Sequence, residues 1–140
     1  MILCDTGPIV AAALAGDDQH RVCVELFTGL LPLANRELLV PATVAAEVGY
    51  LLNREAGPEV EVLFLAALAD ADFTPADLTA VDYRRASELV TTYADLPVGT
   101  TDATVIALAE RLGVEEVATL DHRHFAVVRP PHIPALTLLP

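Results

Sequence analysis

Short hydrophobic runs alternate along the chain with longer stretches in which hydrophobic residues recur every three or four positions. The short runs are typical of buried strands, and the longer stretches are typical of amphipathic helices. Asp17 and Asp18 precede one helical stretch, and Thr43 begins another as its expected cap. Gly57 and Gly113 end two of them. The pattern predicts strands at 2–4, 37–42, 72–76, 114–121 and 135–139, and helices at 8–15, 17–31, 43–57, 58–70, 78–94 and 101–113.

This alternation of strands and helices favours an α/β fold, with a mostly parallel sheet covered by helices. The chain has no repeat and no linker long enough to divide it, so we expect a single domain over residues 1–140. In such folds, ligands bind beyond the carboxyl ends of the strands, where the strand order reverses. Functional side chains are therefore expected at that edge.

Composition limits the class of protein. The chain is 54% hydrophobic, with a mean hydropathy of +0.48, yet no hydrophobic run is long enough to cross a membrane and the N-terminus does not resemble a signal peptide. The expected location is the cytoplasm, without a membrane partner. Cys4 and Cys23 lack metal-like spacing and are expected to be reduced core residues.

Charge narrows the possibilities further. There are 20 acidic side chains against 8 basic ones, all arginine, for a net charge of −12. This balance disfavours a protein that grips nucleic acid through a broad basic surface. An acidic protein can still cleave nucleic acid if divalent metal ions supply positive charge locally.

Two acids follow buried-looking strands. Asp5 ends the run at 2–4, and Asp121 ends the predicted strand at 114–121. Because parallel strands end at the same edge, the two carboxylates can converge there. Taken singly, each could be only a turn residue or a helix cap, since Asp favours both.

Two further acids lie on predicted helices. Glu47 borders a hydrophobic stripe and is expected not to face water; a carboxylate there requires a metal or an ion pair, for instance with Arg54. Asp102 lies in the first turn of its helix, a position that the helix dipole favours without any function. Thr100 and Thr101 can cap that helix, which leaves the Asp102 carboxylate free for another role.

Four carboxylates together indicate a site for Mg²⁺ or Mn²⁺, which prefer oxygen ligands. One or two such ions could support cleavage of a phosphodiester bond. The absence of lysine disfavours receiver domains, haloacid-dehalogenase-like phosphatases and P-loop proteins. Zinc and serine-triad chemistry lack matching residue clusters.

Four segments together resemble the PIN-domain family, and more narrowly the VapC toxins of bacterial toxin–antitoxin pairs. They are LCDTGPIVA, VPATVAAEVGYLL, TDATVIALAERLG and VATLDHRHF, and they cover essentially the whole chain. The resemblance implies a three-layer α/β/α sandwich acting as a Mg²⁺- or Mn²⁺-dependent endoribonuclease. It implies that Asp5, Glu47, Asp102 and Asp121 form the acidic quartet, with Thr6 as a hydroxyl neighbour and Thr101 in support. It also implies a homodimer and a small antitoxin partner.

The resemblance requires that RNA be held by the chain. The candidates are Arg84 and Arg85 on one helix and His122, Arg123 and His124 after the last quartet acid, although surface ion pairing is an alternative for the first two. Two other functions stay open: a PIN-like module that binds RNA or protein without turnover, and a metal-dependent phosphatase. The sequence does not identify the cleaved RNA, the metal, the dimer face or the antitoxin.

Overall fold

The computed structural model describes all residues from 1 to 140 and contains five strands and seven helices. In chain order they are β1 (Ile2–Cys4), α1 (Thr6–Ala13), α2 (His20–Leu30), β2 (Leu38–Pro41), α3 (Ala42–Ala56), α4 (Pro58–Ala69), β3 (Thr74–Ala76), α5 (Ala80–Thr92), α6 (Thr100–Leu112), β4 (Glu116–Ala118), α7 (His122–Val127) and β5 (Thr137–Leu139).

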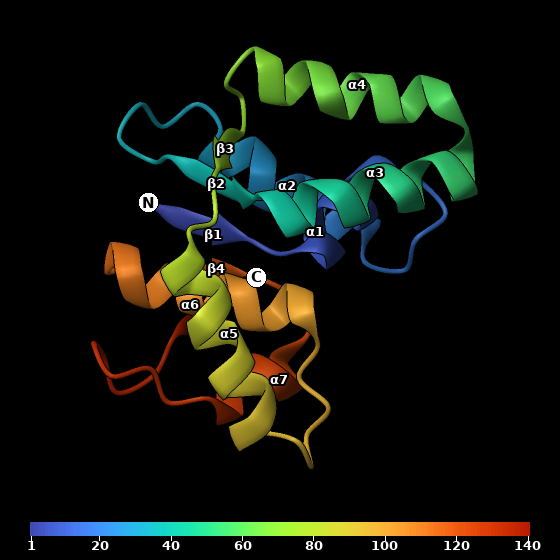
Figure 1. The fold of residues 1–140 in the computed structure, drawn as a ribbon. Helices are drawn as coiled ribbons and strands as arrows, with labels where there is room; N and C mark the ends of the chain where they lie inside the picture. The colour runs from blue at the N-terminus through green and yellow to red at the C-terminus, as the bar shows by residue number, and fades with distance from the viewer.

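The five strands form one sheet in the order β3-β2-β1-β4-β5, and every pair is parallel. Ile2, Leu3 and Cys4 in the central strand are all fully buried, although successive residues point to opposite faces. Both faces of the sheet are therefore covered, which confirms the predicted α/β sandwich with a parallel sheet. Figure 1 shows α1–α4 grouped around β1–β3 in the upper half and α5–α7 in the lower half.

The strand order reverses beside β1. The chain moves from β1 outward to β2 and β3, then crosses back to β4 on the other side of β1 and continues to β5. The segments that leave β1 and β4 therefore diverge from neighbouring strands, and such a point opens a crevice at the carboxyl edge.

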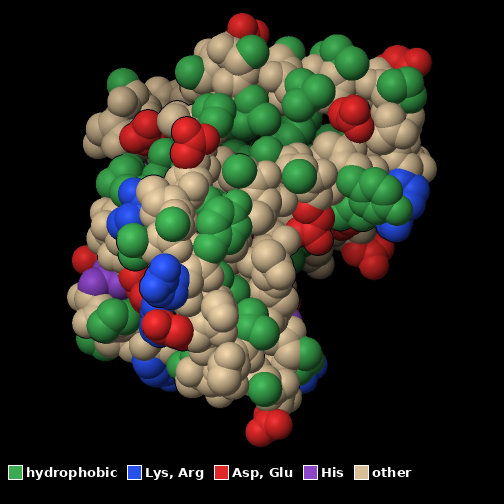
Figure 2. Space-filling model, in the orientation of Figure 1, with side chains coloured by type: hydrophobic (Ala, Val, Ile, Leu, Met, Phe, Trp, Pro, Cys, Tyr) green, Lys and Arg blue, Asp and Glu red, His purple; other side chains and the backbone are tan.

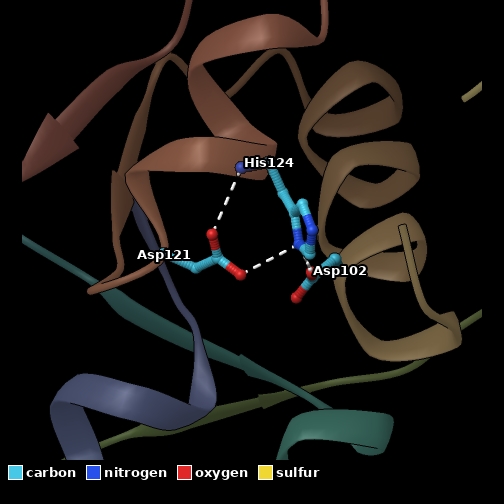
Figure 3. A group of neighbouring side chains, drawn as sticks. All are labelled: Asp102, Asp121 and His124. Carbon is cyan, nitrogen blue, oxygen red and sulfur yellow. Dashed lines mark hydrogen bonds and ion pairs between the residues drawn. The ribbon is translucent and has the colours of Figure 1, made fainter. Parts of the chain in front are cut away.

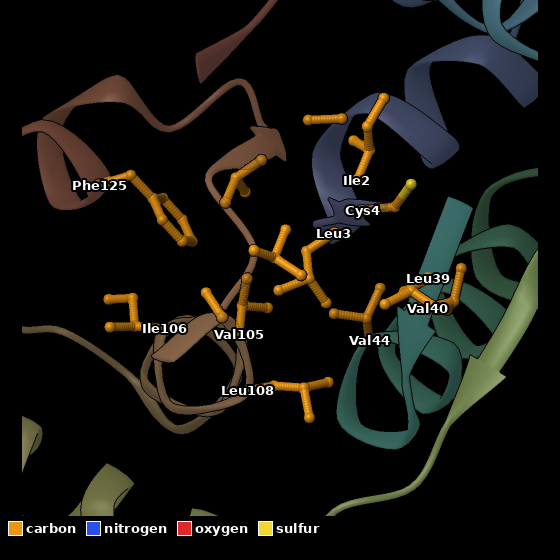
Figure 4. Close-up of a cluster of buried hydrophobic side chains, with 14 of the residues drawn as sticks. Ile2, Leu3, Cys4, Leu39, Val40, Val44, Val105, Ile106, Leu108 and Phe125 are labelled. Atoms are coloured by element: carbon orange, nitrogen blue, oxygen red, sulfur yellow. The ribbon is translucent and has the colours of Figure 1, made fainter. Parts of the chain in front are cut away.

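A single cluster of 27 buried residues packs the sheet against the helices. Leu3 lies at its centre, near Val105 and Leu108 of α6 and Val44 of α3, while Phe125 of α7 closes one side (Figure 4). These side chains fix the first turns of α3 and α6 next to the carboxyl edge. Cys4 and Cys23 are buried and free, as predicted.

Several predicted boundaries are wrong. The strand expected at 114–121 is only Glu116–Ala118, and the short helix α7 was not predicted. Asp121 is consequently the N-cap of α7, three residues beyond β4, and its side chain accepts a hydrogen bond from the backbone N–H of His124 at 3.2 Å. Only six residues long and polar in its first turn, α7 has too little periodicity to be recognised from the sequence.

Most predicted helix starts also differ by a few residues. α1 begins at Thr6, directly after Asp5, and α2 begins at His20, because Asp17 instead accepts the backbone N–H of Gln19 in the preceding turn. α3 begins at Ala42, so Thr43 lies inside the helix and does not cap it. None of the helices is long and apolar enough to cross a membrane.

Candidate metal centre

Asp5 lies at the carboxyl edge of the sheet, beside the point where the strand order reverses. It follows β1 directly, its backbone N–H donates to the carbonyl of Ala118 at the end of β4 at 2.9 Å, and its side chain is only 5% exposed. The hydroxyl of Thr119 donates to Asp5 Oδ2 at 2.8 Å. The parallel pairing of β1 with β4 thus places residues 114 positions apart in direct contact.

Thr119 was not among the predicted site residues. It is fully buried, and besides donating to Asp5 it accepts the backbone N–H of Asp121 at 3.0 Å. The Thr119 hydroxyl therefore connects the side chain of Asp5 with the backbone of Asp121. The only signal in the sequence was a threonine two residues before Asp121, at the end of a hydrophobic run.

Glu47 is held at the edge of this site by Thr6, whose hydroxyl donates to Glu47 Oε2 at 2.9 Å. The expected hydrogen bond of Thr6 is therefore present. The expectation that Glu47 avoids solvent is wrong, because Glu47 is exposed while its neighbour Val48 is buried. The alternative ion pair with Arg54 is also absent, since Arg54 contacts Glu55 at 2.9 Å.

Asp102 and Asp121 meet across the imidazole of His124 (Figure 3). Nδ1 of His124 lies 2.6 Å from Asp102 Oδ2 and 2.9 Å from Asp121 Oδ2. The side chains of Asp102 and His124 are mostly buried, whereas that of Asp121 is 39% exposed. The donor atoms of these three residues all lie within 4.8 Å of one another.

The first turn of α6 is positioned by threonines, but not in the way predicted. Gly99 is the N-cap and no side chain caps the helix, so the capping role expected of Thr100 and Thr101 is wrong. Instead, the Thr104 hydroxyl donates to the carbonyl of Thr101 at 2.8 Å and accepts from Thr43 of α3 at 2.7 Å. This chain of hydroxyls ties the helices that carry Glu47 and Asp102 together.

The site carries several acidic side chains and no arginine that would neutralise them. Burial raises the pKa of Asp5 to about 6; hydrogen bonds from Thr119 and the Thr6 backbone oppose the rise, while the nearby Asp102 and Glu47 add to it. Burial also raises the pKa of Asp102, against the hydrogen bond from His124 and with repulsion from Asp121 and Glu47. No arginine forms an ion pair with any of the four acids. A divalent cation fits this oxygen-rich set because it supplies the missing positive charge.

Residues 2–129 match the family described as PIN domain. The chain belongs to the PIN-domain family. It is 30% identical over 129 residues to Ribonuclease VapC26 of Mycobacterium tuberculosis, an alignment that covers 92% of this chain and 93% of that protein.

Solved structures show the same PIN fold. The crystal structure of VapC20 from Mycobacterium tuberculosis, a sarcin-ricin loop cleaving toxin, matches with a TM-score of 0.80 and 22% identity over 89% of this chain and 92% of that one. VapBC2 from Rickettsia felis, bound to a promoter DNA fragment, matches with a TM-score of 0.67 and 20% identity over 99% and 97%. FitAcB from Neisseria gonorrhoeae matches with a TM-score of 0.64 and 17% identity over 100% and 97%.

The predicted RNA-binding residues of this PIN domain fall into two groups. Arg85 is held by Glu110 of α6 through bonds of 2.7 and 3.1 Å and also contacts Glu88 at 3.1 Å, which disfavours it as an RNA contact. Glu110 lies about 12 Å along α6 from Asp102. Arg84 is exposed on the same turn of α5.

The second group lies beside the acids. His122 and Arg123 are exposed on α7, immediately after Asp121, and neither forms an ion pair. His124 differs from both, because its ring points into the acidic site and not toward solvent (Figure 3).

Proposed function

We infer that this PIN domain is an endoribonuclease and the toxin component of a toxin–antitoxin pair. The observation that carries the inference is an acidic site at the carboxyl edge of a PIN fold: the donor atoms of Asp102 and Asp121 lie close together, and Asp5 is near enough to Asp102 to interact with it electrostatically. The sequence is similar, over nearly its whole length, to a protein named as a VapC ribonuclease. The reaction is hydrolysis of RNA phosphodiester bonds.

The proposed cofactor is Mg²⁺ or Mn²⁺, held by carboxylates of Asp5, Glu47, Asp102 and Asp121. When bound, such an ion activates a water molecule and offsets the charge that develops on the phosphate and the leaving oxygen. The raised pKa values of Asp5 and Asp102 support this assignment, because burial, and to a smaller extent the neighbouring acids, disfavour the charged carboxylates, and a bound cation would stabilise them.

The polar residues around the quartet prepare it for this role. Thr119 fixes one oxygen of Asp5 by hydrogen bonding, and Thr6 fixes one oxygen of Glu47. The hydroxyl pair Thr43–Thr104 holds α3 against α6, so the spacing between their acids is set before any ligand arrives. Held in place in this way, the carboxylates lose little conformational freedom on binding.

The substrate is proposed to approach over α7. Arg123 and His122 are exposed beside Asp121, where they can contact a phosphate or a base next to the cleaved bond. No wide basic surface surrounds them, in keeping with the net charge of −12.

An antitoxin partner is supported by an exposed apolar hollow of about 380 Å³. All 11 residues that line it are hydrophobic, and they come from α1, α2, α3, α4 and the segment before β3. Figure 2 shows hydrophobic side chains gathered over the upper part of the molecule, where α4 exposes Val62, Leu63 and Leu65. A partner that contributes apolar side chains would cover this surface. The proposed homodimer has a second apolar surface available on α5, at Tyr83 and Val90, which lie on the same side of the helix.

Cleavage of structured RNA with Mg²⁺ or Mn²⁺ tests the proposal. We expect the Asp5→Asn variant to be at least about 100-fold slower than wild type, because an essential charge at the reaction centre is lost. The matched control is Asp18→Asn, which alters an exposed acid before α2 and should cleave at the wild-type rate. A chelator should abolish cleavage in both active proteins.

Two outcomes would contradict the proposal. Equal cleavage by wild type and Asp5→Asn would indicate a contaminating nuclease. Binding of RNA or antitoxin with no cleavage of any substrate, even with Mn²⁺, would favour a regulatory binding module.

A further inference from the structure

His124 is the only imidazole that enters the acidic site. Of the other three histidines, His20 is bonded to the carbonyl of Ala11, His132 to the carbonyl of Val114, and His122 is exposed. The side chain of His124 is only 15% exposed, and its Nδ1 lies between the carboxylates of Asp102 and Asp121. Neither hydrogen bonding to RNA nor support of α7 accounts for this position.

We propose that Nδ1 of His124 is a metal donor alongside Asp102 and Asp121, which makes the site a mixed nitrogen and oxygen site that prefers Mn²⁺ to Mg²⁺. This rests on the metal site of the proposed function and extends it beyond the four carboxylates. The geometry is that of a shared centre, since one donor atom from each of the three residues lies within 4.8 Å of the other two.

The fold prepares each donor separately. Asp121 uses Oδ1 to accept the backbone N–H of His124, which leaves Oδ2 directed at the imidazole. His124 is followed by Phe125, which is fully buried and anchors α7 to the core. The imidazole of His124 therefore lies one helical turn after Asp121, the N-cap of α7, and the anchored helix keeps it in the site.

His124 Nδ1, Asp102 Oδ2 and Asp121 Oδ2 are joined by hydrogen bonding through one proton. In the proposed metal complex, the same three atoms bind the cation instead. In the structure, Nδ1–H can donate to Asp102 Oδ2 or Asp121 Oδ2. Coordination needs the lone pair of Nδ1, so the ring proton must then reside on Nε2, which has no protein partner. Two carboxylates and a neutral imidazole balance the charge of one divalent ion.

A donor set of two carboxylates and one imidazole predicts that the site prefers Mn²⁺ to Mg²⁺. Both ions favour oxygen ligands, but Mg²⁺ demands near-ideal geometry and retains its waters, whereas Mn²⁺, as a transition metal, accepts an imidazole nitrogen among oxygen ligands more readily. If His124 instead only orients the carboxylates through hydrogen bonds, the affinities for the two ions should depend on it equally. This difference separates a ligand from a positioning residue.

The test is pulsed electron paramagnetic resonance of the full chain with Mn²⁺, combined with Mn²⁺ titration and Mg²⁺ competition. We expect nitrogen hyperfine coupling from a directly bound imidazole in wild type and its loss in His124→Asn, whose amide can still donate to both carboxylates. Mn²⁺ affinity should fall about 10- to 100-fold in His124→Asn, and Mg²⁺ affinity by less than about threefold. The control is His122→Asn, on the exposed side of the same helix, which should retain coupling and affinity.

Other results would overturn the assignment. Bound Mn²⁺ without nitrogen coupling in wild type, or equal losses of Mn²⁺ and Mg²⁺ affinity in His124→Asn, would leave His124 as a positioning residue and keep the proposed function. If Mn²⁺ does not bind wild type, or binds Asp102→Asn equally well, the metal site of the proposed function fails as well. The wild-type spectrum decides the question even if the His124 variant does not fold.

Discussion

Two buried carboxylates lie in opposite electrostatic surroundings. Asp5, 5% exposed, meets hydroxyl and backbone donors and other acids but no cation, and its pKa is raised to about 6. Asp82 on α5, 1% exposed, accepts two bonds from Arg111 at 2.8 and 3.0 Å. Burial works against ionisation of Asp82 as well, but hydrogen bonds from Arg111 and Thr79 outweigh it and lower its pKa.

The two sites flank α6. Asp102, near Asp5, lies in its first turn, and Arg111, the partner of Asp82, lies in its last. At the last turn, the chain supplies its own cations, Arg111 and Arg85, and the acids stabilise the packing of α5 on α6. At the first turn, it leaves negative charge without an arginine, which suits a site that waits for a metal ion. The difference separates an acid that stabilises the fold from acids that are proposed to bind a metal ion.

The largest expected effect on stability comes from breaking the ion pair between Asp82 and Arg111. Asp82→Asn should lower the free energy of unfolding by about 3 kcal/mol, because it removes the negative charge that pairs with Arg111. The partial exposure of Arg111 keeps the loss at the low end of the range for buried pairs. Urea denaturation measures the change. RNA cleavage by the folded variant should be unchanged, and a loss below about 0.5 kcal/mol would show that the pair contributes no stability.

Adding Mn²⁺ should stabilise the folded protein only if the acidic site around Asp5 and Asp102 is intact. At free Mn²⁺ about 100 times its dissociation constant, wild type should gain about 2.7 kcal/mol of stability. Asp102→Asn, which removes a charge from the proposed site, should gain much less. Thermal unfolding with and without Mn²⁺ measures both, and an equal gain in the two proteins would place the binding elsewhere.

The same substitution at Asp5 should act in the opposite direction from Asp82. The rise in the pKa of Asp5 from 3.8 to about 6 corresponds to about 3 kcal/mol against ionisation at neutral pH. Asp5→Asn keeps an acceptor for Thr119 and removes this penalty, so metal-free protein should gain about 2 kcal/mol at pH 7. Denaturation in a chelator measures it, and destabilisation at pH 7 would contradict the charge imbalance.

The pH dependence should distinguish the two acids. Because the folded-state pKa of Asp5 is raised, its protonated form favours folding, and metal-free stability should fall as pH rises from about 4 to about 6, by at most about 1.4 kcal/mol per pH unit. Asp82 has a lowered pKa, so its contribution is present at neutral pH and is lost as pH falls below about 4. Asp5→Asn should reduce the first slope to the part that the raised pKa of Asp102 contributes and leave the second slope unchanged, as measured by denaturation across this range.

The smallest effects should separate the arginines. Arg85→Ala should cost about 1 kcal/mol of stability through its bonds to Glu110, with RNA cleavage within about twofold of wild type. Arg123→Ala should leave stability unchanged and slow cleavage about threefold at low salt, because a phosphate contact is lost. The reverse pattern would restore Arg85 as an RNA contact.

Much of the fold could be predicted from local sequence pattern. Hydrophobic spacing predicted the parallel sheet, its covering helices and most boundaries to within a few residues. Asp5 after β1 and Asp102 in the first turn of α6 were also found this way, because each lies next to a strong strand or helix signal. The structural reason given for selecting Asp121 was wrong, since this residue does not end a strand but caps a helix too short to show periodicity.

The sequence by itself determined the kind of fold and which acids could meet, because burial patterns and chain order are local properties. Only the tertiary structure decided what each acid touches. The bond between Thr119 and Asp5 spans 114 positions, and the contact between His124 and Asp102 spans 22. The strand order and the packing of α6 against α7 create these contacts, and no periodicity in the chain encodes them. For the same reason, the exposure of Glu47, the ion pairs of Arg85 and the inward position of His124 emerged only once the helices were packed.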